Sequence, residues 1–138
     1  MTETSTTHSI EVVLRSFAAL ERRDNEALDA LYHSEVSFHW PPSLAAAVPA
    51  RTWEEIWDPL QPTQVERRLS PRVVAASERE VVVLWRQRGR RPDGEAFDGE
   101  CLGLYEVRDG KFARAQMFYF DTVAVIDFLA GGRGRSGP

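Results

Sequence analysis

The sequence predicts an α+β fold in which N-terminal helices lead into an antiparallel sheet. Three observations support this prediction. Apolar residues recur at helical spacing early in the chain, they alternate with polar residues over most of the second half, and strong turn signals separate the alternating segments. A length of 138 residues, of which 43% are hydrophobic and 28% are charged, is typical of one domain with a sizeable core.

Three helices are expected in the first half of the chain. The first covers residues 10–20, with Ser9 as its candidate N-cap, and Asp24 is expected to cap a short second helix. A capping box opens the third helix over residues 52–60, and Pro59 is expected to end or kink it.

Five strands are expected from the alternation of apolar and polar residues, over 36–40, 65–76, 81–90, 95–107 and 111–120. Pro71 in the second of these favours an edge or a bulge. The polar turn at 77–80 and the turns around Gly94 and Gly110 join the last four strands as an antiparallel meander. Asp121 is expected to cap a final helix.

The ends of the chain look unlike the rest. Residues 1–8 are rich in Ser and Thr and residues 131–138 are rich in Gly, so we expect two flexible tails around a domain over 9–130. The start is polar rather than signal-like, and no apolar run approaches the roughly 18 residues of a membrane span, so we expect a cytoplasmic protein.

Charge and cysteine content exclude several classes of function. The formal net charge is -4 and the basic residues form no stripe with interleaved aromatic residues, so nucleic acid and membrane surfaces are not expected partners. Cys101 is the single cysteine, which excludes an internal disulfide. His33, Glu35 and His39 lack a recognised ligand spacing, and we therefore expect neither a metal ion nor a cofactor.

Long strands twist and coil, so such a sheet can wrap around the helices as a cone with an apolar pocket inside. The convex face then requires a cover, and a second copy of the same sheet would provide one. We therefore expect a hydrophobic small molecule in the cone and a homodimer through the convex face.

The element order and two segments resemble a known family. Residues 37–42 (Ser-Phe-His-Trp-Pro-Pro) close the first strand, and residues 102–111 span the last hairpin. Over about residues 10–130 the chain resembles the nuclear-transport-factor-2-like superfamily, and within it the SnoaL-like domains, a group that includes polyketide cyclases, ketosteroid isomerases and limonene epoxide hydrolases. The resemblance implies a cone-shaped pocket and a dimer, and it leaves the reaction open because this fold hosts many functions.

Two catalytic sets of these relatives are missing from the matching positions. Trp40 stands where a ketosteroid isomerase has its base, and Ser16 and Gly103 stand at its oxyanion donors. Leu84 and Arg86 stand where an epoxide hydrolase has an arginine and an aspartate. The resemblance therefore supports neither of these two reactions.

Arg86 is the first catalytic candidate, because strand alternation is interpreted as placing it inside the cone beside Cys101 and Gly103. An interior guanidinium would hold an enolate, phenolate or carboxylate oxygen, with Arg88 nearer the mouth. The alternatives are a structural ion pair, for which Glu55, Asp58 and Asp121 are candidates, or exposure at the rim.

Asp121 is the second candidate. Its position resembles that of the aspartate that serves as acid and base in SnoaL-like polyketide cyclases. The alternative is that Asp121 only caps the final helix, and this explains the residue equally simply.

Aromatic side chains are expected to line the pocket. Strand alternation turns His39 outward if Phe38 and Trp40 face inward. The even-numbered residues of the last strand are expected inside, although a one-residue bulge would turn them outward. The full set of expected lining residues is Phe38, Trp40, Trp53, Trp57, Leu84, Arg88, Cys101, Gln116, Phe118 and Phe120.

The sequence thus favours a SnoaL-like enzyme without a cofactor, a cyclase, isomerase, dehydratase or hydrolase acting on a hydrophobic, oxygen-bearing molecule of polyketide or terpene type. The alternative is a non-catalytic domain that binds a small ligand or forms a dimer.

Overall fold

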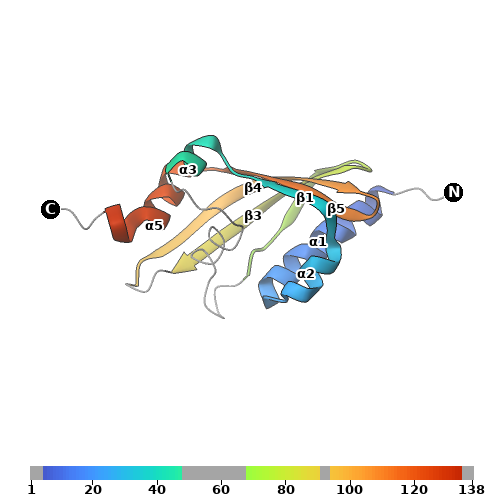
Figure 1. Cartoon of the computed structure of the whole chain (residues 1–138), viewed down its shortest axis with the longest axis horizontal. Helices are drawn as coiled ribbons and strands as arrows, with labels where there is room; N and C mark the ends of the chain where they lie inside the picture. Colours follow the sequence, from blue (N-terminus) through green and yellow to red (C-terminus); the bar gives the residue numbers. More distant parts are fainter. Residues whose placement is uncertain (1–4, 48–67, 91–93, 135–138) are drawn as a thin grey trace.

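The computed structural model describes residues 5–47, 68–90 and 94–134, with the backbone alone for 130–134. The sheet has five strands, and Figure 1 shows the two N-terminal helices along one side of this curved sheet, with the two later helices together near its other end. The elements are α1 (Thr6–Arg22), α2 (Asn25–Leu31), β1 (Tyr32–His39), α3 (Pro42–Ala47), β2 (Arg72–Ala76), β3 (Glu80–Arg90), β4 (Ala96–Arg108), β5 (Lys111–Tyr119) and α5 (Thr122–Gly134). The predicted α+β class is confirmed, and the third predicted helix lies outside the described residues.

Helix α1 begins earlier than its apolar pattern indicates. Ser5 is the N-cap and its hydroxyl accepts a hydrogen bond from the backbone nitrogen of His8 at 3.0 Å. Ser9, the expected cap, is buried within the helix, and its hydroxyl donates to the carbonyl of Glu78 instead. The predicted cap of α2 is confirmed, since Asp24 Oδ1 accepts from the backbone nitrogen of Ala27 at 3.0 Å.

The strand order is β1-β5-β4-β3-β2, with β2 to β5 antiparallel as predicted and β1 parallel to β5. Strands β3 and β4 pair without a register shift, from Glu80 opposite Glu106 to Arg90 opposite Ala96. Pro71 directly precedes β2, which lies at an edge of the sheet, where proline does not interrupt a ladder of hydrogen bonds.

One face of the sheet, the inner face, is buried. On β3 and β4 it is formed by the odd-numbered residues, including Val83, Trp85, Cys101 and Tyr105. Phe17 of α1 packs on this face, with its ring centroid 5.4 Å from that of Trp85 and 5.8 Å from that of Tyr105. The even-numbered residues of these strands form the outer face, which is half-buried or exposed.

Strand β5 changes face near its start. Val107 pairs with Phe112 but Glu106 pairs with Arg114, so one extra residue lies between the two pairs as a bulge. Beyond the bulge, Ala115, Met117 and Tyr119 are buried, and the even-numbered residues point to the outer face. None of the described helices is long and apolar enough to cross a membrane.

Candidate functional site

A small cavity lies between α1 and the inner face. Its volume of about 20 Å³ leaves room for one water molecule. Its wall is largely aromatic and includes Phe17, Tyr32, Phe38, Trp85, Tyr105 and Phe112. A ligand larger than water therefore requires side chains of this wall to move.

The polar groups of the interior stay uncharged at neutral pH. Burial raises the pKa of Tyr105 and of Tyr119 well above their ordinary value of 10.0, and the neighbouring Cys101 thiol acts in the same direction. A side-chain hydrogen bond with Trp40 only partly offsets this for Tyr119. Burial also raises the pKa of Cys101, so these groups are neutral hydrogen-bonding groups rather than bases.

Gln87 is the unusual polar residue of the inner face. Its side chain is fully buried, and within the described part of the chain neither its amide nitrogen nor its amide oxygen has a hydrogen-bond partner. It lies two residues along β3 from Trp85, and Gly99 stands opposite it on β4. A buried amide without partners costs about 1–3 kcal/mol for each unpaired group, so the position is expected to serve a function.

Two glycines of β4 make room for aromatic rings on the inner face. A Cβ atom at Gly103 would lie 2.1 Å from the hydroxyl oxygen of Tyr105, and one at Gly99 would lie 2.8 Å from the ring of Phe97. Only the absence of a side chain at these positions allows both rings to lie against the strand.

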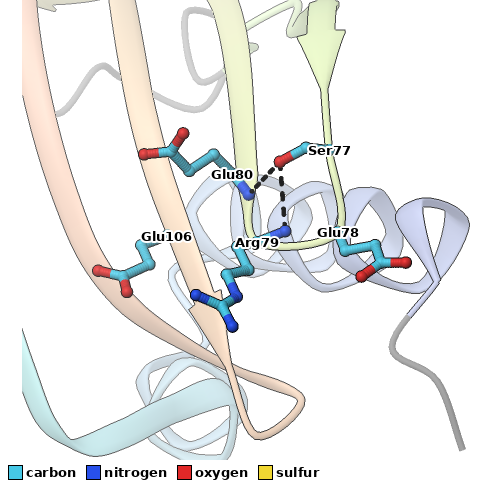
Figure 2. Close-up of a pocket in the computed structure, with 5 residues that line it drawn as sticks. All are labelled: Ser77, Glu78, Arg79, Glu80 and Glu106. Carbon is cyan, nitrogen blue, oxygen red and sulfur yellow. Dashed lines mark hydrogen bonds between the residues drawn. The ribbon is translucent and has the colours of Figure 1, made fainter.

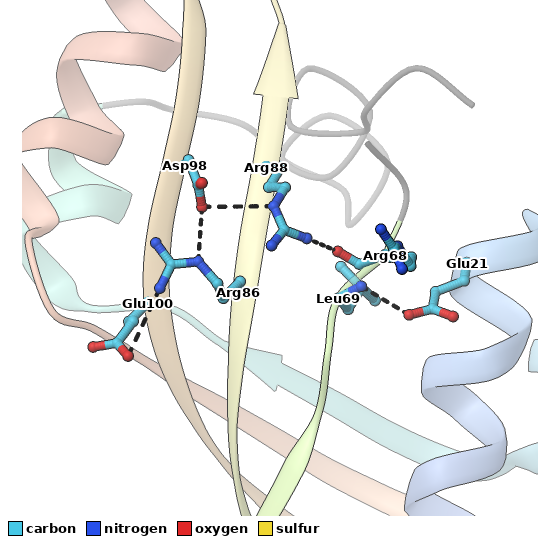
Figure 3. Close-up of polar contacts among 7 residues, drawn as sticks. All are labelled: Glu21, Arg68, Leu69, Arg86, Arg88, Asp98 and Glu100. Atoms are coloured by element: carbon cyan, nitrogen blue, oxygen red, sulfur yellow. Dashed lines mark hydrogen bonds and ion pairs between the residues drawn. The ribbon is translucent and has the colours of Figure 1, made fainter. Parts of the chain in front are cut away.

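The prediction that Arg86 faces the interior is wrong. The register places Trp85 opposite Cys101, whereas Arg86 lies opposite Glu100 on the outer face. Figure 3 shows the Arg86 guanidinium paired with Asp98, with Nε and Oδ1 at 2.9 Å, and reaching Glu100 at 3.8 Å. The physical reason is that an ion pair at the surface avoids the desolvation of a buried charge, so Arg86 forms a structural pair, with partners other than those expected.

Arg88 also lies on the outer face rather than in the pocket. Its Nε is 3.7 Å from Asp98 Oδ1, and its Nη1 donates to the carbonyl of Arg68, as Figure 3 shows. The next residue, Leu69, is held by Glu21, whose Oε2 accepts from the Leu69 backbone nitrogen at 2.7 Å. These contacts tie the chain before β2 to both β3 and α1.

Asp121 is exposed and caps α5, with Oδ1 accepting from the backbone nitrogen of Ala124 at 3.1 Å. The predicted cap is therefore confirmed. The acid and base role of Asp121 stays a prediction.

The expected lining residues divide into three groups. Phe38 and Trp40 pack against the core and Cys101 is buried in it. Trp53 and Trp57 lie outside the described residues. The placement inside the pocket is wrong for the remaining members, Leu84, Arg88, Gln116, Phe118 and Phe120.

The error on β5 has a clear physical cause. The bulge at its start reverses the facing of Gln116 and Phe118, and Phe118 is 45% exposed while Phe120 is 86% exposed. His39 pairs with Gln116 and faces outward, as predicted for His39 alone, and its ring nitrogen Nε2 lies 3.0 Å from the Ser37 hydroxyl.

A second hollow, of about 550 Å³, opens at the turn between β2 and β3 (Figure 2). Ser77 Oγ accepts from the backbone nitrogens of Arg79 and Glu80 at 3.3 and 3.1 Å, which orders the turn. Within the described ranges, no three His, Cys, Asp or Glu side chains are grouped so that they could hold a metal ion. The Ser77 hydrogen bonds in this hollow shape the turn between β2 and β3.

The curved sheet and its N-terminal helices share the fold of a solved NTF2-like structure. Residues 13–115 match the SnoaL-like domain, and the chain belongs to that family. No curated protein matches the sequence.

Several solved structures share the fold at low sequence identity. TerC, co-crystallised with polyporic acid, is 22% identical over 88% of this chain and 98% of its own, with a TM-score of 0.69. An NTF2-like protein of unknown function from Burkholderia pseudomallei is 18% identical over 88% and 97% of the two chains, with a TM-score of 0.68. A candidate SnoaL-like polyketide cyclase from Jannaschia sp. CCS1 is 16% identical over 94% and 96%, with a TM-score of 0.66. At these identities the likeness concerns the fold.

Gln87 was not among the residues that the sequence was expected to place in the pocket. The strand pattern nevertheless indicates that Gln87 faces inward. Val83, Trp85 and Gln87 alternate along the strand and are uncharged, whereas the residues between and after them include Arg86 and Arg88. Charged residues are rarely buried without a partner, so the uncharged set is the better choice for the inner face.

Proposed function

We propose that this SnoaL-like domain binds an uncharged, hydrophobic small molecule with carbonyl or hydroxyl oxygens between α1 and the inner face. The observation that carries the proposal is the buried, unpartnered amide of Gln87 on an aromatic inner face. The ring-lined wall favours flat apolar groups, and the Gln87 amide, two residues along β3 from Trp85 of that wall, would supply one polar anchor, a combination typical of small-molecule sites.

We further propose that the bound molecule is a substrate for a cyclase, isomerase, dehydratase or hydrolase reaction without a cofactor. A Gln87 N–H directed at a substrate carbonyl would stabilise negative charge that develops on its oxygen. The protonated Tyr105 and Tyr119 supply further neutral dipoles, and the aromatic wall would hold the substrate in a reactive conformation. The family membership and the neighbours described as polyketide cyclases support this choice of reaction class.

Native mass spectrometry of the protein, after incubation with a panel of polyketide- and terpene-like compounds, tests the binding proposal. The wild-type protein is expected to retain at least one oxygen-bearing compound. Arg86→Leu is expected to retain the same compound, because Arg86 lies on the outer face. If the wild-type protein retains none of the panel, the proposed function is wrong.

A dimerisation role remains a second candidate because of the outer face. Phe118 and Phe120 are exposed there, beside the half-buried Leu102 and Leu104. We propose that a second copy covers this face. Sedimentation velocity tests this: the wild-type chain is expected to sediment as a dimer and Phe118→Glu as a monomer, whereas a wild-type monomer at tens of micromolar would contradict the proposal.

A further inference from the structure

The Gln87 side chain offers two different hydrogen-bonding groups on a single carbon. Its nitrogen is a donor and its oxygen is an acceptor, and within the described residues neither has a partner. Because the two groups are fixed side by side in one plane, a ligand that satisfies both must carry its own acceptor and donor on the same or adjacent atoms.

The described strand positions around Gln87, on β3, β4 and β5, carry no charged side chain on the inner face. The closest inner-face positions are Trp85 and Gly89 along the strand and Gly99 across from it. The two glycines place no polar side chain beside the amide, and none of these described inner-face positions supplies a cation to a buried anion.

We infer that the site selects a neutral ligand edge in which a hydroxyl stands beside a carbonyl, and that Gln87 recognises this edge with two parallel hydrogen bonds. The Gln87 N–H donates to the ligand carbonyl, and the ligand hydroxyl donates to the Gln87 oxygen. This inference rests on the proposed small-molecule function and specifies its ligand class.

The same geometry rejects the deprotonated form of such a ligand. Loss of the hydroxyl proton leaves two acceptors facing the site, so the Gln87 oxygen meets a negative oxygen instead of a donor. The buried negative charge adds a desolvation cost. Affinity is therefore expected to fall as the pH rises through the pKa of the ligand hydroxyl.

Tropolone, a flat ring with a hydroxyl beside a carbonyl, is a suitable probe, and 2-methoxytropone is its matched control without the donor. Binding is followed by tryptophan fluorescence, since Trp85 lies on the same face as Gln87. Wild-type protein is expected to bind tropolone about tenfold or more tightly than 2-methoxytropone. Above the pKa of tropolone, its affinity is expected to fall by a similar factor.

Two substitutions at Gln87 test its role. Gln87→Met, which keeps the length of the side chain, is expected to bind both probes equally and weakly. Gln87→Glu, which in its protonated form again offers a donor beside an acceptor, is expected to restore the preference for tropolone at low pH. Thermal unfolding of both variants confirms that they are folded.

The outcomes separate this inference from the proposed function. If wild-type protein retains other hydrophobic compounds but does not distinguish tropolone from 2-methoxytropone, the inference is wrong and the proposed function stands. If Gln87→Met keeps the wild-type preference, the inference is also wrong. Binding that strengthens above the pKa of tropolone would show that the site takes the anion, which overturns the inference as well.

Discussion

Replacement of Gln87 by Met is expected to stabilise the ligand-free protein. The side chain is fully buried, and its amide nitrogen and oxygen lack partners among the described residues. Each unpaired group costs about 1–3 kcal/mol, and Met has a similar length without these groups. Allowing for partial relief by local movement, the free energy of unfolding should rise by about 1–3 kcal/mol.

The corresponding change in melting temperature follows from the size of the chain. An unfolding entropy of about 2.1 cal/mol/K per residue gives about 290 cal/mol/K for 138 residues, so the expected rise in Tm is about 3–10 °C. Differential scanning calorimetry and urea unfolding measure the two quantities on the same samples.

Gln116→Met is the matched control, because it makes the same substitution on the outer face. The Gln116 Oε1 accepts from Arg114 Nη2 at 2.8 Å, so this amide is paired, and the change should stay within about 0.5 kcal/mol of zero. If Gln87→Met lowers the free energy of unfolding by 1 kcal/mol or more, the Gln87 amide is satisfied in the ligand-free protein and the reasoning fails.

Three further predictions concern the rest of the interior and the cap of α5. Gly103→Ala should destabilise the fold by about 1–3 kcal/mol in urea unfolding, since the added Cβ would lie 2.1 Å from the Tyr105 hydroxyl; an unchanged stability would show that the ring moves freely. The free energy of unfolding should fall as pH rises above about 10. In the unfolded chain Tyr105 and Tyr119 ionise at their ordinary pKa of 10.0, whereas in the folded chain their raised pKa keeps them neutral. A free energy of unfolding that stays constant up to pH 11 would contradict their burial. Asp121→Asn keeps the cap and should leave the free energy of unfolding nearly unchanged, whereas Asp121→Ala should lower it by about 1 kcal/mol. If Asp121 is an acid and base, Asp121→Asn should abolish turnover of an identified substrate although its stability is unchanged.

The fold was largely predictable from the sequence because its signals are local. The Asp24 cap, the turn at Gly110 and the alternation along β3 and β4 each depend on neighbouring residues. The parallel pairing of β1 with β5 joins segments distant in the chain, and no local pattern indicates it.

The candidate site was less predictable, because facing depends on register. A single extra residue near Ala113 turned Phe118 and Phe120 outward, and alternation does not reveal such a bulge. For β3 the sequence does indicate which side chains face inward, because the alternating residues that include Gln87 are uncharged, whereas those that include Arg86 are not. A charged residue, Arg86, was expected inside, whereas Arg86 lies on the outer face and the fully buried Gln87 is neutral.

Ligand binding at Gln87 can be observed directly through the NMR resonance of its side-chain amide. In a ¹⁵N-labelled sample this resonance is identified by its loss in Gln87→Met, and tropolone is then titrated at a pH below the pKa of its hydroxyl. We expect a saturable shift of the Gln87 side-chain signal, with little change at Gln116 on the outer face. A Gln87 signal that stays unchanged at saturating tropolone would contradict binding at Gln87.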